Sequence, residues 1–272
     1  MFYYLSKTIK HIDQIVEILI QEFPHIKTII QNINERHDNV ILGDEEKILY
    51  GKGYIYDTLL DNQYKISLKS FYQINPIQVE KLYQTAIDLA HLNNDSIVLD
   101  AYCGIGTITL SLAKHVKKVY GVEVVPQAIE DAKNNALLNK IDNAEFVCDD
   151  AGKYMVELVK KNTHLDVVFV DPPRKGCSEE FLEHLIQASP KEIIYISCDV
   201  ATQARDAKYL NEHGYTITHC QPVDMFPHTF HVESIVLLSH KSPDSHIDVK
   251  VEFGEGEEKV PLDKIAERAK QH

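Results

Sequence analysis

The stretch SIVLDAYCGIGT at residues 96–107 decides the fold, because a short β-branched apolar run leads directly into a loop with two glycines. Glycine permits a tight turn and lets a ligand approach bare backbone, and the amino end of a following helix attracts negative charge. No Gly-Lys-Ser/Thr triplet follows, and Thr109 stands where a dinucleotide fingerprint has its third glycine. The stretch therefore predicts a nucleotide or nucleoside pocket around Gly104, Gly106 and Thr107, with a plain strand-to-helix turn as the alternative.

Downstream of this loop, strand-like runs alternate with helix-like stretches such as residues 126–140 and 178–189. Six or seven strands are expected, from the runs SIVLD, KKVYGVE, NAEFVCDD, LDVVFVD, KEIIYISCD, YTITHC and ESIVLLSH. Such alternation predicts an α/β fold in which helices cover both faces of a mainly parallel sheet. The last two runs are separated by too little chain for a helical crossover, so they should pair antiparallel. This layout, a seven-stranded Rossmann-like sheet ending in an antiparallel pair, resembles that of class I methyltransferases.

The flanking segments have a different character. Residues 1–75 predict a small α+β unit, with a helix-like stretch from Ile9 to Phe23 followed by short strands broken by NERHD, GDEEK, GKG and LDNQ. Residues 76–240 form the main domain, which opens with an amphipathic helix. Residues 241–272 are a polar tail that contains the run GEGEEK.

The composition, with 44% hydrophobic and 25% charged residues, is that of an ordinary globular protein. Neither a signal-like amino terminus nor an apolar run near the ~20 residues of a membrane span is present, so we expect a cytoplasmic monomer without a membrane partner. Forty-one acidic against 28 basic residues give a formal charge of -13, which works against long-range attraction to nucleic acid phosphates. The five cysteines show no C-x-x-C pair and no zinc spacing, which predicts free thiols.

Acidic and aromatic side chains mark the ends of the first three strands. Glu123 follows Asp100 by 23 positions and closes the second strand, where a carboxylate accepts ribose hydroxyls or is simply a solvated strand end. Tyr102 is expected to flank the ligand or to pack under the turn. At the end of the third strand, Asp149 and Asp150 both remain candidates for contact with an adenine amine, and a plain helix cap is the alternative.

The segment DPPRKG, from Asp171 to Gly176, follows the fourth strand near the point where strand order reverses, which is where open α/β sheets bind ligands. Its two prolines stiffen the loop, and together with the acid and the two cations they favour a functional loop over a strand-terminating turn. Arg174 and Lys175 supply the local positive charge that the whole chain lacks. Each is expected to contact phosphate, or else to be a surface charge.

Cys198, within ISCD, ends the fifth strand and so lies on the same edge of the sheet as Asp100, Glu123 and Asp171. The thiolate is the reactive form of cysteine, and the helix start that follows this strand is expected to lower the thiol pKa. Cys198 is therefore the candidate nucleophile, and an inert core cysteine is the alternative.

The other four cysteines divide into two pairs. Cys103 lies in the glycine loop and Cys177 follows DPPRKG, so both are rivals for the role of nucleophile. Cys148 and Cys220 are expected to be structural.

The last strand begins with Glu233, directly after the loop FPHTFH, and its alternation with apolar neighbours leaves an exposed strand residue as the alternative to a functional one. The same loop carries His228 and His231. No carboxylate or cysteine completes a ligand set with them, so no metal site is expected.

Five motifs, in this order, resemble those of the RNA uracil-5 methyltransferases, the ribosomal and transfer RNA 5-methyluridine enzymes. They are FYQIN, DAYCGIGT, DPPRKG, ISCD and FPHTFHVE, and the resemblance spans residues 26–240. It implies an S-adenosylmethionine-dependent enzyme that methylates carbon 5 of uridine in RNA. The implied cofactor contacts are Gln73, Tyr102, Glu123 and Asp171, and the implied nucleophile and base are Cys198 and Glu233.

Family members typically carry an amino-terminal OB-like RNA-binding domain, some with an iron-sulfur cysteine cluster, and this sequence shows neither. An acidic chain without that domain is expected to hold the cofactor yet to bind RNA weakly. As substrate, ribosomal RNA, above all 23S rRNA, is favoured over transfer RNA.

Two other interpretations remain. The second interpretation is an RNA cytosine-5 or amino methyltransferase. Cytosine-5 enzymes typically have a cysteine within the proline motif, and amino methyltransferases have an aromatic residue after it, where this chain has Arg174. The motif DPPRKG therefore disfavours both. A non-catalytic chain that binds only cofactor or RNA is the third interpretation, and it predicts cofactor binding without methyl transfer.

Overall fold

A computed structural model describes residues 8–35 and 41–241 of the 272-residue chain. Of the polar tail predicted from residue 241 onward, residues 242–272 lie outside the described part. Within the described ranges, no helix is both long and apolar enough to cross a membrane.

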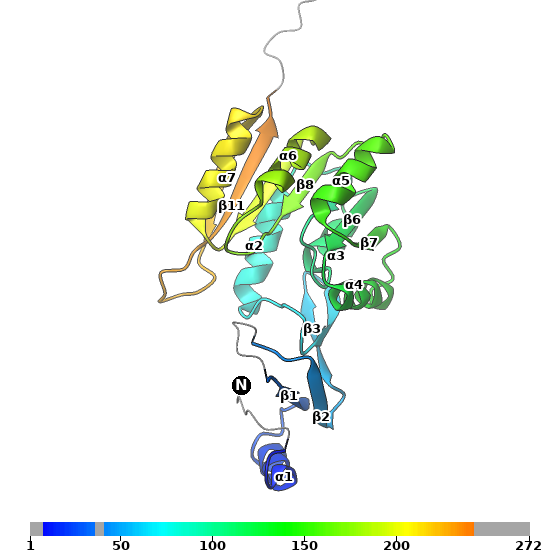
Figure 1. The fold of residues 1–272 in the computed structure, drawn as a ribbon, viewed down its shortest axis with the longest axis vertical. Helices are drawn as coiled ribbons and strands as arrows, with labels where there is room; N and C mark the ends of the chain where they lie inside the picture. Colours follow the sequence, from blue (N-terminus) through cyan, green and yellow to red (C-terminus); the bar gives the residue numbers. More distant parts are fainter. Residues whose placement is uncertain (1–7, 36–40, 242–272) are drawn as a thin grey trace, which may run out of the picture. The chain divides into compact units, whose positions relative to one another are not determined.

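The main sheet has seven strands in the order β10-β11-β9-β8-β5-β6-β7 (Figure 1). Strands β5 to β9 pair in parallel, whereas β11 pairs antiparallel with both β9 and β10. This confirms the predicted seven-stranded sheet and its antiparallel end. The bounds of the strands are β5 Ile97–Asp100, β6 Lys118–Glu123, β7 Ala144–Cys148, β8 Val167–Val170, β9 Glu192–Ser197, β10 Tyr215–Val223 and β11 Glu233–His240.

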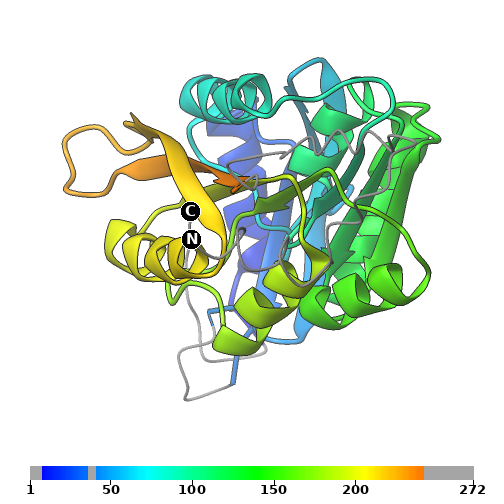
Figure 2. The same ribbon diagram turned by 90° about the horizontal axis from the view of Figure 1, so that it is seen from above.

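Helices cover both faces of this sheet (Figure 2). One apolar cluster packs α2, α3 and α4 onto Val98 and Val119, and a second packs α5, α6 and α7 onto Leu99 and Val122. Neighbouring residues of one strand thus serve opposite faces, as the pleat of a strand requires. The helices are α2 Pro76–Leu89, α3 Thr107–Ala113, α4 Pro126–Leu138, α5 Ala151–Lys160, α6 Glu179–Ala188 and α7 Val200–Glu212.

Local sequence explains where these helices begin. Pro76 and Pro126 open α2 and α4, at the position where proline's missing N–H costs no hydrogen bond. The Ser178 side chain caps α6 by accepting from Phe181 N, and Asp199 caps α7 by accepting from Ala201 N and Thr202 N.

The expected amino-terminal α+β elements are present as helix α1 (Ile12–Glu22) and two antiparallel hairpins. The first hairpin joins β1 (Thr28–Ile33) to β2 (Glu45–Gly51), and the second joins β3 (Tyr54–Leu59) to β4 (Asn62–Ser67).

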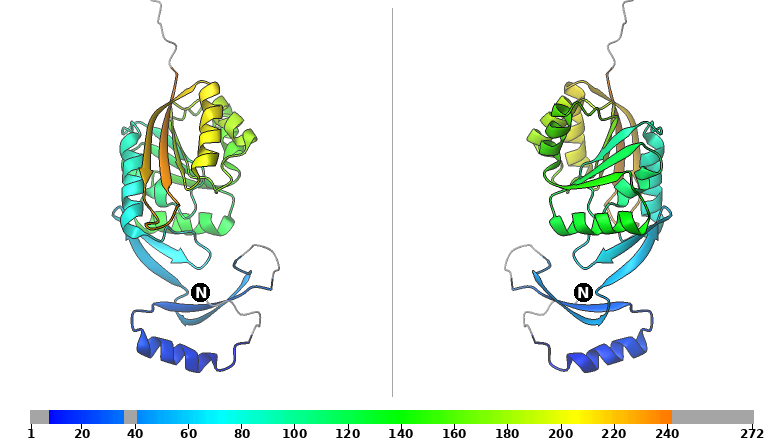
Figure 3. Two further views of the ribbon diagram at one scale, coloured as in Figure 1. Left: turned by 90° about the vertical axis from the view of Figure 1, so that its left-hand side faces the viewer. Right: turned by 90° about the vertical axis from the view of Figure 1, so that its right-hand side faces the viewer.

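Strand β4 lies next to helix α4 of the main sheet (Figure 3), and side-chain hydrogen bonds connect β4 to α3 and α4. Lys65 N donates to Asn135 Oδ1 at 2.8 Å, and Ser67 Oγ donates to Asp131 Oδ2 at 2.8 Å, both on α4. Tyr64 OH donates to the carbonyl oxygen of Thr107 at 3.1 Å, at the start of α3. The second hairpin is therefore tied to the helix that begins at the glycine loop.

Candidate active site

The candidate residues gather at the carboxyl edge of the parallel strands, and the strand register explains why. Val170 is paired with Tyr195, so the residues that follow β8 and β9 emerge side by side. Ser234 is paired antiparallel with Ser197, which brings Glu233 opposite Cys198 at the next position of the ladder. Segments far apart in sequence thus bring Asp171, Cys198 and Glu233 to one edge.

The glycine loop turns tightly at this edge. Gly106 N donates to Cys103 O at 2.8 Å, and both Gly104 (φ 52°) and Gly106 (φ 87°) have left-handed backbone. A Cβ on Gly106 would come within 3.0 Å of the Phe146 ring, whereas one on Gly104 would meet nothing within 4 Å. The backbone beside Gly104 is therefore open to a ligand, and the loop continues into α3 at the half-buried Thr107.

Asp100 lies fully buried beneath this loop. Thr109 Oγ1 donates to its Oδ2 at 2.6 Å, while the buried Oδ1 has no hydrogen-bond partner. Burial raises the pKa of this carboxyl to about 7. A buried oxygen without a partner calls for an explanation, and a donor on a bound ligand would provide one.

Glu123 and Gln73 are both half-buried. Glu123 ends β6, and its Oε1 accepts from Val125 N at 3.0 Å. Gln73 lies between β4 and α2. The Tyr102 ring packs 5.5 Å from the Phe181 ring, which corresponds to the packing alternative for this residue.

The two aspartates after β7 differ in their local bonds. Asp150 is the helix cap of α5, with Oδ1 accepting from Lys153 N at 3.0 Å. Asp149 Oδ1 accepts from Asp150 N at 2.7 Å, and both residues are exposed.

The surroundings of Asp171 and Glu233 raise the pKa values of both carboxyl groups. Burial, and then the charges of Glu233 and Asp100, raise the pKa of Asp171 to about 8. Burial raises the pKa of Glu233 to about 6, against an opposing effect of the Arg174 charge. Glu233 is only 4% exposed, so the alternative of an exposed strand residue is wrong.

The thiol of Cys198 is partly accessible, but its pKa is not lowered as the sequence suggested. Burial and the charge of Glu233 raise this pKa, and hydrogen bonding and positive charge from Arg174 oppose the rise. The expected effect of the following helix is outweighed because desolvation and a neighbouring carboxylate both disfavour a thiolate. Arg174 is therefore the group that favours the reactive form.

The other cysteines are less suited to nucleophilic attack, or lie elsewhere. All five are free thiols, as predicted. Burial raises the pKa of Cys103 well above its ordinary value and that of Cys177 to about 12. Cys148 and Cys220 are exposed: Cys148 closes β7, and Cys220 lies on the edge strand β10. That both are structural stays a prediction.

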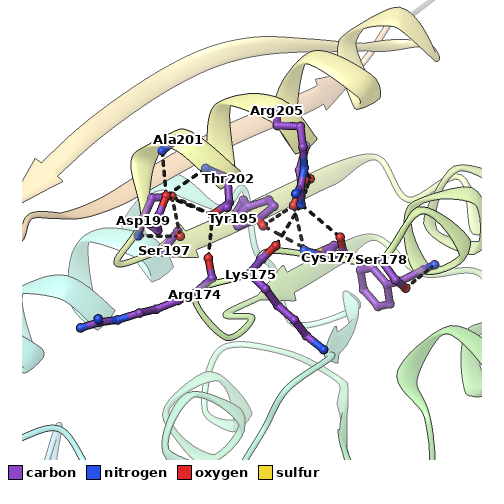
Figure 4. A network of polar contacts seen from close by, with 12 residues as sticks. Arg174, Lys175, Cys177, Ser178, Tyr195, Ser197, Asp199, Ala201, Thr202 and Arg205 are labelled. Carbon is purple, nitrogen blue, oxygen red and sulfur yellow. Dashed lines mark hydrogen bonds and ion pairs between the residues drawn. The ribbon is translucent and has the colours of Figure 1, made fainter.

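A polar network around the buried Asp206 anchors the DPPRKG loop, taken as the motif at residues 171–176 together with the Cys177 that follows it, to helix α7 and strand β9 (Figure 4). Asp206 Oδ2 accepts from Cys177 N and from Tyr195 OH, both at 2.8 Å. Arg205 Nε donates to Asp206 Oδ1 at 2.8 Å, and Arg205 Nη2 donates to Lys175 O at 3.1 Å. Asp206 is thus a buried acid whose two oxygens both have partners.

The same network orients the loop's cations. Thr202 Oγ1 donates to Arg174 O at 3.0 Å, which holds the backbone of Arg174 against α7. Figure 4 shows the side chains of Arg174 and Lys175 extending away from the network in different directions. The effects of Arg174 on the pKa values of Cys198 and Glu233 place its guanidinium on the side of those two residues.

The residues of this network were missed in the sequence. A signal was present, because Gln203, Asp206, Ala207 and Leu210 recur at helical spacing and form the buried face of α7. A charged residue on a buried face requires a specific partner. Only the fold shows that the partners are Cys177 N, Tyr195 and Arg205.

Among the described residues, no group of three or more histidines, cysteines or acids could hold a metal ion. His228 and His231, the two histidines of the FPHTFH loop, belong to this part of the chain.

The family model that matches residues 14–241 is described as tRNA (uracil-5-)-methyltransferase. An RNA methyltransferase of Streptococcus mutans, named as uncharacterized, is 53% identical over 227 residues, covering 84% of this chain and 50% of the relative. A similarly named protein of Oceanobacillus iheyensis is 47% identical over 243 residues, covering 89% and 53%. The chain therefore spans about half the length of the curated relatives it matches.

Solved structures give the same match at the level of the fold. The tRNA (uracil-54, C5)-methyltransferase of Pyrococcus abyssi, in complex with S-adenosyl-L-homocysteine, is 33% identical with a TM-score of 0.68, covering 80% of this chain and 52% of that one. The tRNA m1G37 methyltransferase of M. jannaschii is 12% identical with a TM-score of 0.55, covering 88% and 71%, a likeness of fold alone. These likenesses confirm the class I methyltransferase fold.

Proposed function

Because this chain belongs to the tRNA (uracil-5-)-methyltransferase family, we propose that it transfers a methyl group from S-adenosylmethionine to carbon 5 of a uridine in RNA. One observation carries the proposal: Ser197 and Ser234 are paired across β9 and β11, which brings Cys198, directly after β9, next to Glu233 at the start of β11. The charge of Glu233 accordingly raises the pKa of the Cys198 thiol. A neighbouring thiol and carboxyl suit a reaction that needs both a nucleophile and a base.

The chemistry explains why both groups are required. Carbon 5 of uracil is a poor nucleophile, and addition of the Cys198 thiolate at carbon 6 produces an enolate that makes carbon 5 reactive. Once carbon 5 carries the methyl group, Glu233 removes the proton from it, and elimination breaks the sulfur–carbon 6 bond. The electron pair of that bond returns to Cys198, which is ready for a further cycle.

The residues around the glycine loop fit the cofactor. S-adenosylmethionine supplies the methyl group when bound, and its hydroxyls and amines would meet Asp100, with its unpartnered Oδ1, and the carboxylate of Glu123. Gly104 leaves the loop backbone open and Gly106 permits the tight turn beside it, and Gln73, Tyr102, Thr107 and Asp171 complete the proposed set.

The pKa values support a division of roles between the two acids. Glu233, with a pKa near 6, is ionised at neutral pH yet remains a stronger base than an ordinary carboxylate. Asp171, raised to about 8, retains a proton at neutral pH and so lessens the negative charge next to Cys198. Arg174 is proposed to favour the thiolate, and Lys175 to contact an RNA phosphate.

We propose ribosomal RNA, in particular 23S rRNA, as the substrate, with transfer RNA as the alternative. The name of the family and the Pyrococcus abyssi enzyme both concern tRNA, so both RNA classes belong in any assay.

The test is covalent trapping. Incubated with S-adenosylmethionine and 23S rRNA or tRNA that contains 5-fluorouridine, the protein should form a denaturation-resistant adduct, because fluorine cannot leave as a proton. Cys198→Ala should form none, and Cys148→Ala, which removes an exposed thiol, should form as much as the wild type. An undiminished adduct with Cys198→Ala would show that the mechanism is wrong.

A second variant tests the base. Glu233→Gln cannot remove the carbon 5 proton, so it should accumulate a methylated adduct on ordinary uridine RNA, where the wild type turns over. Cofactor binding by the wild type without any adduct on either RNA would favour the non-catalytic interpretation instead.

A further inference from the structure

Large apolar side chains project into solvent close to the candidate active site. Among the described residues, the five most exposed of them are Phe230 at 90%, Ile74 at 81%, Leu137 at 76%, Phe71 at 75% and Ile77 at 69%. Four of these five lie in two short segments, residues 71–77 and the FPHTFH loop of residues 226–231. Burial of apolar groups is the default in folded proteins, so this clustering indicates an interaction surface.

The two segments are neighbours in the fold. Asn75 Nδ2 donates to Met225 O at 3.0 Å, directly before the FPHTFH loop. Met225 is buried, and Phe226 and Tyr72 pack against the same apolar cluster. The exposed side chains therefore project from a common, well-packed base.

The FPHTFH loop holds Phe230 at a defined position. Thr229 Oγ1 donates to Phe226 O at 2.8 Å, and His231 N donates to Thr229 Oγ1 at 3.1 Å. The rings of Phe230 and His231 lie 4.3 Å apart between centroids. Two positions after His231, the chain enters β11 at Glu233, the proposed base.

The chemistry of the loop favours a nucleobase as its partner. The FPHTFH loop contains no lysine or arginine, so it lacks the cations that most often contact phosphate. An exposed aromatic face stacks on any base, and a base next to a flipped uridine loses a stacking partner within the RNA. Phe230 precedes the proposed base Glu233 by only three positions, so a base that neighbours the bound uridine would come close to its ring.

We propose that Phe230 stacks on a nucleobase adjacent to the target uridine and so contributes to RNA binding. The inference rests on the proposed function. It assigns to the FPHTFH loop a binding role that is separate from the chemistry of Cys198 and Glu233.

The absence of tryptophan from the chain allows a direct test. Phe230→Trp carries a single indole, and addition of a 23S rRNA or tRNA transcript should quench its fluorescence as the ring stacks. Leu137→Trp is the matched control: Leu137 is 76% exposed and lies in the last turn of α4, which leads to β7, the edge strand at the other end of the strand order from β10. Equal quenching of both indoles, or none at Phe230→Trp under conditions where RNA binds, would overturn the proposal.

Kinetics give the second measurement. Phe230→Ala should raise KM for RNA roughly ten-fold with little change in kcat, whereas Phe230→Tyr should keep a KM close to that of the wild type. Leu137→Ala should change neither parameter. An unchanged KM for Phe230→Ala would contradict the stacking role.

The two proposals fail separately. If the wild type forms the 5-fluorouridine adduct but Phe230→Trp shows no specific quenching, only the stacking role is wrong. If quenching occurs without an adduct, the RNA contact stands and the methyl transfer does not.

Discussion

The DPPRKG loop and the FPHTFH loop lie at the same edge of the sheet, yet they are held by different kinds of interaction. The DPPRKG loop is bonded to a buried acid on another element, Asp206, and to Arg205 beside it. The FPHTFH loop is closed by bonds between its own residues and leaves Phe230 almost fully exposed.

The difference matches the task proposed for each loop. Arg174 must face Cys198 closely to favour a thiolate, and small errors in such positions are costly in catalysis. A ring that stacks on RNA tolerates small displacements, because stacking has no strict directional requirement. The predictions below therefore compare the DPPRKG loop, which is anchored to α7, with the FPHTFH loop, which is exposed.

The largest effect is expected for Asp206→Ala. It leaves Cys177 N and the buried hydroxyl of Tyr195 without an acceptor, and it removes the partner of Arg205. The free energy of unfolding should fall by about 2–5 kcal/mol, measured by urea denaturation, because unsatisfied buried donors are costly. The adduct of Cys198 should form more slowly as well.

Two control variants accompany this prediction. Asp206→Asn keeps one acceptor oxygen and should lose clearly less stability than the alanine variant. Asp142→Ala removes an exposed acid and should change the free energy of unfolding by less than about 0.5 kcal/mol. A loss for Asp206→Ala no larger than this would show that the network does not hold the loop.

A somewhat smaller effect is expected for Gly176→Ala within the same loop. Gly176 has φ 74°, and a Cβ there would lie 2.6 Å from both Arg205 Nη2 and Asp206 Oδ2. We expect a loss of about 2 kcal/mol in unfolding free energy, from backbone strain and displaced partners. Gly104→Ala, with φ 52° but open space, should cost less, and a reversed order would contradict this account of the loop.

The pH dependence of stability tests the buried carboxyls beside the anchored loop. The folded protein binds protons at Asp171 and Glu233 more tightly than the unfolded chain does, because their pKa values are raised to about 8 and about 6. The free energy of unfolding should therefore be highest near pH 4 and fall by several kcal/mol as pH rises toward 8, because one unit of pKa shift corresponds to about 1.4 kcal/mol. Asp100, with its pKa raised to about 7, adds to this fall. Asp171→Asn should flatten this decline, and an equally steep decline in that variant would show that Asp171 does not cause it.

The rate of methyl transfer should rise with pH, whereas the free energy of unfolding should fall. Both Glu233 and Cys198 must lose a proton to act, so the rate of methyl transfer should rise as pH passes about 6 and continue to rise with the raised thiol pKa. Arg174→Ala should move the upper limb to higher pH, measured as kcat/KM against pH, because it removes the charge that favours the thiolate. An unmoved upper limb would mean that Arg174 does not act on Cys198.

The smallest effect on stability is expected in the open loop. Phe230→Ala removes a side chain that is 90% exposed, so the free energy of unfolding should change by less than about 0.5 kcal/mol. Urea denaturation of this variant, alongside the KM measurement, would separate folding from RNA binding. A loss of several kcal/mol would show that the ring is packed rather than presented.

The sheet could be predicted from the sequence because its signals are local. Each parallel strand is a short apolar run, and prolines or capping residues such as Pro126, Ser178 and Asp199 mark the helix starts that follow. The positions of Cys198 and Glu233 at strand ends followed from the same pattern. Their pairing across β9 and β11 could not be predicted in this way, because the sequence indicated an antiparallel pair of β10 and β11 but not that β11 lies beside β9.

The sequence could not predict the pKa values of the site residues. The helix start after β9 suggested a lowered pKa for Cys198, but burial and the charge of Glu233 raise it. Glu233 is separated from Cys198 by 35 positions, and no local pattern reports how close their charges lie. The exposure of Cys148 and Cys220 was likewise a property of the strands' positions within the sheet.

By itself, the sequence determined the order of strands and helices, the glycine loop and the reactive side chains at the strand ends, because each depends on neighbours along the chain. Tertiary structure alone decided that Asp206 holds the DPPRKG loop, that Arg174 is the charge that favours the Cys198 thiolate, and that Phe230 stays in solvent. The physical reason is that burial and electrostatic interaction act through space, between groups that folding brings together from distant parts of the chain.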